Sequence, residues 1–355
     1  MTHDTGPLYR TDALIHYADA LLQKAGLATA PAASVARTLV EGDLLGHDTH
    51  GLAQLAGYVK EIESGSMARD GVADVVSDRP AAVLWDGKRL PGPWLIEQGL
   101  NMLVPRARNL GTASLVIRRS HHIACLAVYM LRALEEDMLM VLACSDPAGA
   151  SVAPFGGTKA VFTPNPLALG FPLTQGGVMV DISASITTNG MSNRKRAAGE
   201  TFADNWLIDA TGQVTNDPQV LFNKPPGTLL PVGGLNHGHK GYGMALLVES
   251  ITGGLAGHGR ADPSEGWGAT VHITLHDIHA FGGKAAFLRQ MDHIAGLCRT
   301  NPPIDPARPV RLPGEGGLKR RDAQLKDGVR LHPSIAASLA DLETRHGLRL
   351  AEALA

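Results

Sequence analysis

Residues 238–243, with the sequence GHKGYG, combine a histidine and a lysine with three glycines directly before a predicted apolar helix over Met244–Leu255. Glycines allow a ligand to approach the backbone closely, and the first amides of a helix are unpaired donors at its positive end. Lys240 would add a full positive charge. The pattern therefore predicts an anion-binding site at His239 and Lys240, with a tight turn between solvated side chains as the alternative.

Two further segments place histidines where predicted elements begin or end. His50 follows Thr49 at the junction of two predicted helices, and His122 lies between a predicted strand and a predicted helix. An imidazole titrates near neutral pH, so it can donate or accept a proton during a reaction. Both histidines are therefore candidate acid/base residues. The alternative at the first segment is structural, because Thr49 could cap the next helix through its hydroxyl and leave His50 in solvent.

Other polar clusters could bind phosphate or a metal ion. Hydroxyl-bearing residues over Ser183–Gly190 follow a short predicted strand and could bind phosphate or form a solvated polar loop. The basic run at residues 193–196 is interpreted as solvated. The region of His237, His239 and His272 raises a metal-dependent hydrolase or lyase as a second hypothesis. No carboxylate or cysteine ligand accompanies these histidines, so we assign no metal site.

Apolar periodicity predicts the elements that must position these residues. The first 65 residues are predicted as helices, and from residue 81 strands alternate with helices as in an α/β sheet. Ligands bind such sheets where strands end and helices begin, which is where His122 is expected. The predicted strands are Ala81–Trp85, Ser114–Ile117, Met138–Ala143, Val178–Ile182 and Thr270–Leu275, and the predicted helices lie at 11–26, 31–46, 52–62, 94–107, 123–135 and 335–345.

The composition is that of an ordinary globular protein. The chain has 355 residues, of which 44% are hydrophobic and 19% charged, with a formal net charge of -2. Such a chain lacks the basic field that attracts nucleic acid or an anionic membrane, so a small-molecule substrate is expected. Residues 1–10 lack the apolar region of a signal peptide, and the three cysteines are scattered, so a cytoplasmic location is expected.

Six segments, in this order, resemble the type-2 malate/L-lactate dehydrogenase family, whose members include sulfolactate, ureidoglycolate and diketogulonate oxidoreductases and a cyclic-imine reductase. Each motif alone is weak, but six in register over about 270 residues identify the family. His239–Gly243 matches the family's lysine element outright. The similar segments are Thr49–Gly51, His121–Ala124, Pro154–Gly157 with Pro164–Pro166, Asp181–Ser185 and Pro313–Glu315.

The resemblance implies a non-Rossmann nicotinamide-binding fold of the L-sulfolactate dehydrogenase-like type, an α/β (α+β) protein with a mixed-sheet domain and an interrupted helical domain. The helical domain would cover residues 1–75, completed by parts of 185–260 and 315–355, and the α/β cofactor-binding domain would cover 76–315. NAD or NADP would be the cofactor and a homodimer the assembly. The residues implied to bind cofactor are Ser145, Asp181, Ile182, Ser183, Ala184, Ser185, Ile186, Thr187, His239, Lys240, Gly314 and Glu315.

The implied reaction is hydride transfer between the nicotinamide and a 2-hydroxy or 2-keto acid or a related substrate. The alternatives are cyclic-imine reduction within the same family and a catalytically impaired member that only binds ligand. The family assigns the acid/base role to the residue matching His50 or to the one matching His122, and we favour His122. This histidine is flanked by His121 and by Ile123–Ala124, where the family has Asn and Phe-Gly.

One departure from the family bears on the substrate. The arginine that clamps the substrate carboxylate, three residues after the Ser-His-Gly element, falls at Gln54, and an amide cannot replace a bidentate cation. Either Lys60, Arg118 or Arg119 takes the anion, or the substrate is not a simple 2-hydroxy acid. Thr49 keeps the hydroxyl of the family's serine. The residues expected to bind substrate are Thr49, Gln54, Lys60 and Arg118.

Overall fold

Strand β11 (Ala269–Asp277) lies at the centre of the main sheet in the computed structural model, which describes residues 6–263 and 265–354. Ala269, Val271, Ile273 and Leu275 are at most 4% exposed, so one face of the strand is fully buried. The strand pairs antiparallel with a neighbour on each side. The strand predicted at residues 270–275 is therefore confirmed and is longer at both ends.

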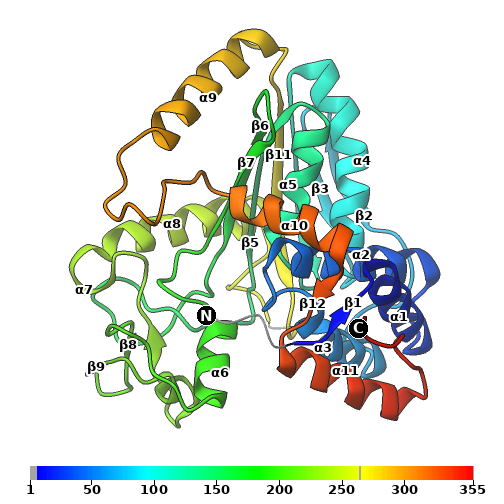
Figure 1. Ribbon diagram of the computed structural model, residues 1–355, viewed down its shortest axis with the longest axis vertical. Coiled ribbons are helices and arrows are strands. Elements are labelled where there is room, and N and C mark those ends of the chain that lie inside the picture. Colours follow the sequence, from blue (N-terminus) through cyan, green and yellow to red (C-terminus); the bar gives the residue numbers. More distant parts are fainter. Residues whose placement is uncertain (1–5, 264, 355) are drawn as a thin grey trace.

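The main sheet has seven strands in the order β2-β3-β4-β11-β5-β6-β7 (Figure 1). β3 and β4 pair parallel and every other pair is antiparallel, so the expected mixed α/β fold is confirmed. Strands β4 and β5 are connected through α5 (Leu126–Glu135), but β11 lies between them in the sheet. A local sequence pattern cannot indicate this long-range insertion. The remaining strands are β2 (Asp74–Arg79), β3 (Ala82–Asp86), β4 (Thr112–Ser120), β5 (Met138–Ser145), β6 (Leu167–Pro172) and β7 (Gly177–Ile182).

Two predicted helices, α4 (Gly92–Leu110) and α5 (Leu126–Glu135), share one apolar cluster with the main sheet. The sequence pattern does not predict α9 (Lys284–Arg299) or α10 (Glu315–Asp327). Helix α10 has no buried residue and α9 has only Ala295, so neither shows a broad apolar stripe. Among the described residues, no helix combines the length and apolar character needed to cross a membrane.

The early helices form a second core with the end of the chain (Figure 1). Strand β1 (Leu8–Tyr9) pairs antiparallel with β12 (Val329–Arg330), which brings the late segment to the early one. The division into domains at residues 75 and 315 remains a prediction. The helices of this core are α1 (Thr11–Lys24), α2 (Thr29–Leu45), α3 (Leu55–Glu63) and α11 (Pro333–His346), with a short 3₁₀ turn at Leu52–Gln54.

A smaller cluster gathers residues between 152 and 245, including Val152, Phe202 and Leu229. The basic run interpreted as solvated lies on a helix, with Asn193 and Arg196 exposed and Arg194 paired with Asp48 at 3.1 Å. The local charge pattern did not reveal this distant partner. The elements of this region are α6 (Asn189–Ala197), β8 (Leu207–Ile208), β9 (Val214–Thr215), a 3₁₀ turn at Pro218–Phe222, β10 (Thr228–Leu229) and α7 (Gly234–His237).

Helix α8 (His239–Glu249) contains most of the GHKGYG segment, so the prediction that this segment precedes the helix is wrong. The helix continues as a π-helical turn over Ser250–Gly254. Glycine disfavours a helix interior, but a Cβ at Gly241 would lie 2.3 Å from the backbone nitrogen of Val232. Close packing therefore outweighs the low helix propensity of this glycine.

Candidate active site

A cavity of about 410 Å³ is lined by the loop after α2, the ends of strands β4, β5 and β7, and the start of α6. Its volume lies in the range typical of small-molecule sites. Both candidate acid/base histidines line this cavity, together with the glutamine that replaces the family's arginine. Six lining side chains that bear on its chemistry are His47, Thr49, His50, Gln54, His122 and Trp267.

The loop that carries Thr49 and His50 is shaped by Asp43, near the end of α2. The Asp43 carboxylate accepts a 2.7 Å hydrogen bond from the Leu52 N–H and so caps the following 3₁₀ turn. Asp43, and not Thr49, is therefore the cap. A Cβ on Gly51 would lie 2.5 Å from the same carboxylate, which requires glycine at this position. Burial raises the pKa of Asp43 to about 8.

His50 and His122 share the cavity, with their ring centroids 6.1 Å apart. Thr49 Oγ1 lies 2.9 Å from His50 Nδ1, which positions the imidazole of His50. Burial lowers the pKa of His50, although Asp181 partly offsets this effect. The two histidines that sequence reasoning leaves as alternatives thus belong to one site.

Tyr58, from α3, holds the ring of His122. The Tyr58 Oη lies 3.0 Å from His122 Nδ1 and 3.0 Å from the carbonyl oxygen of His122. Both bonds form together when Nδ1–H donates to Oη and Oη–H donates to the carbonyl, which leaves Nε2 free to accept a proton. The Ala124 N–H lies 3.4 Å from Nδ1, too far to compete strongly with this arrangement.

Trp267 forms an aromatic wall beside His122. The two ring centroids are 4.6 Å apart and the ring planes are inclined by 31°. Burial holds the pKa of His122 well below its usual value, and His50 and His121 lower it further. The imidazole of His122 is therefore neutral at neutral pH, with Nε2 unprotonated in this tautomer.

His121 turns away from the cavity and fixes the backbone of the second histidine segment. Its Nδ1 accepts a 2.8 Å hydrogen bond from the His122 N–H, and its Nε2 lies 3.3 Å from Glu61. Burial lowers the pKa of His121, which Glu61 partly opposes. Ala124 has a φ of +59°, a left-handed conformation that glycine adopts most readily. This backbone explains why the family motif has glycine there.

Three residues implied to bind cofactor line the cavity at the end of β7. They are Asp181, Ile182 and Ser183. The Asp181 carboxylate accepts a 2.9 Å hydrogen bond from the Ala127 N–H in the first turn of α5, where helix amides stabilise negative charge. The side of the cavity nearest β7 is therefore acidic and fixed to the helix.

The loop after Ser183 passes directly beside the start of α8. The Val232 N–H donates to the Ala184 carbonyl oxygen at 2.8 Å, and a Cβ on Gly241 would lie 2.6 Å from that oxygen. The close approach that Gly241 permits is therefore to the chain itself and not to a ligand. His239 and Lys240, on the first turn of the same helix, are exposed.

Other residues implied to bind cofactor are engaged within the chain. The Ser145 hydroxyl donates to Glu249 at 2.8 Å, and the Ser185 hydroxyl donates to the Thr187 carbonyl oxygen at 2.6 Å. A Cβ on Gly314 would lie 2.9 Å from the backbone of β7. The glycine turn before α10 thus packs on the strand that leads to the cavity. The cofactor roles of these residues remain predictions, as do those of Ile186 and Glu315.

Among the described residues, one group of side chains has a spacing compatible with metal binding. His47, Cys125 and Asp181 each offer an atom within 4.8 Å of the other two. The Cys125 thiol donates to the Asp181 carboxylate at 3.7 Å, and burial raises its pKa well above the usual value. The hydrogen bond from the thiol to the carboxylate accounts for this contact without an ion, and the expected absence of a metal remains a prediction.

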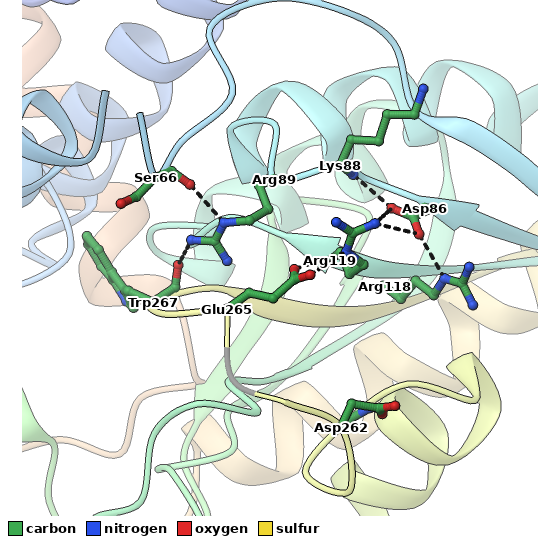
Figure 2. Close-up of polar contacts among 10 residues, drawn as sticks. Ser66, Asp86, Lys88, Arg89, Arg118, Arg119, Asp262, Glu265 and Trp267 are labelled. Atoms are coloured by element: carbon green, nitrogen blue, oxygen red, sulfur yellow. Dashed lines mark hydrogen bonds and ion pairs between the residues drawn. The ribbon is translucent and has the colours of Figure 1, made fainter. Parts of the chain in front are cut away.

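Two residues expected to bind substrate lie outside the cavity lining. Lys60 is exposed on α3. The Arg118 Nε donates to Asp86 at 3.0 Å, and Arg119 contacts the same carboxylate at 3.3 Å (Figure 2). Both arginines are therefore committed to Asp86 and do not replace the family's carboxylate clamp within this chain.

Sequence reasoning missed Tyr58 and Trp267. Tyr58 falls on the apolar face of a predicted helix, where an aromatic residue indicates only core packing. Trp267 stands between Gly266 and Gly268 before β11, and paired glycines of this kind are a signal for close approach of the backbone. Its contact with His122 joins segments 145 residues apart in the chain, which no local pattern could indicate.

Comparison with known proteins identifies relatives along almost the whole chain. A sequence profile of malate/L-lactate dehydrogenases matches residues 9–340. The chain is 26% identical over 347 residues to malate dehydrogenase of Pyrococcus abyssi, covering 95% of this chain and 94% of that protein. It is 28% identical over 335 residues to Delta(1)-pyrroline-2-carboxylate reductase of Ancylobacter novellus, covering 91% and 94%. The crystal structure of malate dehydrogenase from Entamoeba histolytica shares the fold, with a TM-score of 0.91, 22% identity, and coverage of 98% and 99%.

Proposed function

Because the chain belongs to the malate/L-lactate dehydrogenase family, we propose that it is an NAD(P)-dependent oxidoreductase that moves a hydride between nicotinamide and a 2-hydroxy or 2-keto acid or a related substrate such as a cyclic imine. The observation that carries this proposal is the cavity in which His50 and His122 face the Asp181–Ser183 segment. Relatives named as a malate dehydrogenase and as a Delta(1)-pyrroline-2-carboxylate reductase support the reaction class.

His122 is proposed as the acid/base residue. When bound, the nicotinamide accepts or supplies the hydride. In oxidation His122 Nε2 takes the proton of the substrate hydroxyl, and in reduction it returns that proton to the substrate oxygen. Tyr58 keeps both of its 3.0 Å hydrogen bonds in either state, so the imidazole need not turn between the two directions. His50 is proposed to contact the same substrate oxygen, because its ring centroid lies 6.1 Å from that of His122.

The surface beside the cavity fits an anionic cofactor. Lys240 is exposed on the first turn of α8, and no described residue forms an ion pair with it. This ammonium group would hold the diphosphate together with first-turn amides of α8 other than that of Gly241, which donates to the Val232 carbonyl oxygen at 3.1 Å. Asp181 to Ser183 would lie against the nicotinamide end. The contact between Ala184 and Gly241 supports the arrangement, because it places the two segments side by side.

A homodimer is proposed as the assembly. Exposed apolar side chains on and after α8 and on α9 include Leu246, Leu247 and Leu255, and Ile294 and Leu297, each between 48% and 60% exposed. Apolar side chains left exposed on two helices are candidates for burial at a protein interface. Light scattering coupled to size-exclusion chromatography should give twice the chain mass. A monomer at micromolar concentration would contradict this part of the proposal.

The first experiment is a titration of the purified protein with NADH and with NADPH, followed by nicotinamide fluorescence. Binding of either supports the proposal and decides the cofactor preference, whereas failure of both contradicts it. Cofactor binding without turnover of any keto acid or cyclic imine would favour the impaired, ligand-binding alternative. Stoichiometric metal in the purified protein would instead support the metal-dependent hypothesis, and its loss with His47→Ala would assign the ion to His47, Cys125 and Asp181 rather than to the region of His237, His239 and His272.

A further inference from the structure

The cavity contains acidic side chains and lacks basic ones. Asp146 and Asp181 line it, and its described lining includes no lysine or arginine. Two of its three imidazoles, His50 and His122, have pKa values lowered by burial. A substrate carboxylate held here would lose its hydration without gaining a cation from this chain.

Gln54 presents an acceptor where the family has a cation. Its Nε2 donates a 2.7 Å hydrogen bond to the carbonyl oxygen of Thr49, and this contact fixes the amide orientation because a carbonyl can only accept. No described residue donates to Gln54 Oε1, and the glutamine lines the cavity. The remaining acceptor is therefore available to an N–H or O–H group of a ligand and is unfavourable for a carboxylate.

The arginines on one side of the cavity fix its aromatic wall (Figure 2). Arg89 donates to the carbonyl oxygens of Ser66 at 2.8 Å and of Trp267 at 2.9 Å, and Arg119 pairs with Glu265 at 3.0 Å. Their charges are used to hold the loop that carries Trp267. They are structural, and a ligand in the cavity meets the indole ring and not the guanidinium groups.

The arginine behind the opposite wall is also engaged. Arg260 donates to Glu249 at 2.7 Å and to the carbonyl oxygen of Gly149 at 2.6 Å. Its contact with Thr163, which lines the cavity, is 3.5 Å. The charge of this guanidinium is balanced by a carboxylate, so it does not make the cavity basic.

We propose that the substrate is a cation, an iminium ion in the direction of reduction and an amine in the direction of oxidation, without a carboxylate at Gln54. This inference rests on the proposed function and narrows its substrate class. Asp146 and Asp181 offset the positive charge, and Gln54 Oε1 accepts the substrate N–H. The indole of Trp267 supplies an electron-rich surface that favours a cation.

The balance of protons agrees with a neutral histidine. The carbon of a protonated imine takes a hydride from the reduced nicotinamide, the π electrons of the carbon–nitrogen double bond pass to nitrogen, and a neutral amine results, so the protein supplies no proton. In reverse, His122 Nε2 takes one proton from the protonated amine, and the neutral amine then loses its hydride to the oxidised nicotinamide. Ketone reduction differs in its proton balance, because the alkoxide oxygen that forms must receive a proton, which the proposed function assigns to His122.

The test compares ligands that differ only in the carboxylate. Piperidine and piperidine-2-carboxylate are titrated into the protein loaded with whichever reduced nicotinamide binds, and the cyclic imines corresponding to both are assayed for reduction. We expect the carboxylate-free compound to bind, and its imine to be reduced, with a preference of roughly tenfold or more, the effect of one unpaired charge interaction. Gln54→Arg should reverse the preference. Arg118→Ala should leave it unchanged, because Arg118 is bound to Asp86.

Equal or tighter binding of the carboxylate-bearing compound to the unmodified protein would overturn the inference, and would point to a cation from a partner subunit. Failure of both compounds to bind a nicotinamide-loaded protein would overturn it as well. Failure of NADH and NADPH to bind is a separate result, which rejects the proposed function itself. Thermal melting of Gln54→Arg verifies that a changed preference does not come from misfolding.

Discussion

The cavity and the start of helix α8 both contain segments similar to the same family, yet the chain completes only the cavity by itself. In the cavity, His122 and Gln54 are held by hydrogen bonds to Tyr58 and Thr49. At α8, Lys240 is exposed to solvent, whereas Gly238 and Gly241 beside it are packed against the chain. The polar groups of the cavity are therefore oriented before any ligand arrives, whereas the lysine needs a ligand to orient it.

Burial explains this difference. A buried polar group must find a hydrogen-bond partner when the chain folds, so its position is decided by the protein. An exposed ammonium group is solvated by water and gains little from a fixed position. Substitutions in the cavity should therefore change chemistry or stability, and substitution of the exposed Lys240 side chain should change mainly the affinity for the cofactor.

The largest expected effect is that of His122→Ala. Removing a positioned acid/base group lowers kcat by roughly 10²- to 10⁴-fold. The affinity for nicotinamide, measured by fluorescence, should remain within about twofold, because the side chain acts on the proton. His50→Ala serves as the comparison. If His122→Ala remains fully active while His50→Ala does not, the assignment of the acid/base residue is wrong.

Lys240→Ala should have the opposite profile. Loss of one charge-assisted contact with a phosphate weakens cofactor binding by about tenfold or more and leaves kcat at saturating cofactor nearly unchanged. Lys60→Ala is the matched control, since that lysine is exposed and lies outside the cavity lining. If Lys240→Ala and Lys60→Ala weakened cofactor binding equally, the effect would be one of overall charge, and Lys240 would have no specific role in binding the cofactor.

Two glycine substitutions test the packing of the two regions. Gly51→Ala places a Cβ 2.5 Å from the Asp43 carboxylate, and we expect a loss of about 1–3 kcal/mol in the free energy of unfolding. Gly243→Ala meets nothing within 4 Å on α8 and should stabilise the helix by roughly 0.5–1 kcal/mol. Urea denaturation measures both. A destabilised Gly243→Ala would show that the start of α8 is more closely packed than this open position indicates.

A further expected effect concerns the pH dependence of stability. Because the pKa of Asp43 is raised from 3.8 to about 8 in the folded protein, its contribution to stability is complete below about pH 4 and is lost as the pH rises towards 8. Asp43→Asn cannot titrate and retains an acceptor for the Leu52 N–H. The melting temperature of the variant relative to the unmodified protein should therefore be higher near pH 9 than near pH 5. A constant difference would contradict a raised pKa.

Local sequence patterns predict the parts of this fold that alternate or repeat on a short scale. The strand at β11 and the early helices are examples, because their apolar residues follow the periods of strand and helix. The position of β11 between β4 and β5 is a long-range fact and escapes such patterns. Helix α10 escapes them for another reason, since it buries no residue and leaves no apolar stripe.

The residues of the candidate site also divide into those that a local pattern reveals and those that only long-range contacts reveal. His50 and His122 could be named because histidines at element boundaries are recognisable, and the family resemblance supported both. The role of Arg118 could not be predicted, because its partner Asp86 lies 32 residues away on a neighbouring strand. The hydrogen bond from Tyr58 to His122 spans 64 residues and was equally hidden. The charge and type of a residue identify it as a candidate for the site, but only the fold shows whether its side chain is already bonded to another residue.

Two hydrogen bonds of Arg89 join distant segments of the chain on one side of the cavity. One side chain joins Ser66, which follows the early helices, to Trp267, which precedes β11, through two carbonyl oxygens. Separating these segments would break two charged hydrogen bonds, each contributing about 1.5–3 kcal/mol. On the other side, near Thr188–Gly190, Arg194 pairs with Asp48 at 3.1 Å. Substrate entry should leave Trp267 in place, because moving its loop away from Ser66 would break both hydrogen bonds of Arg89.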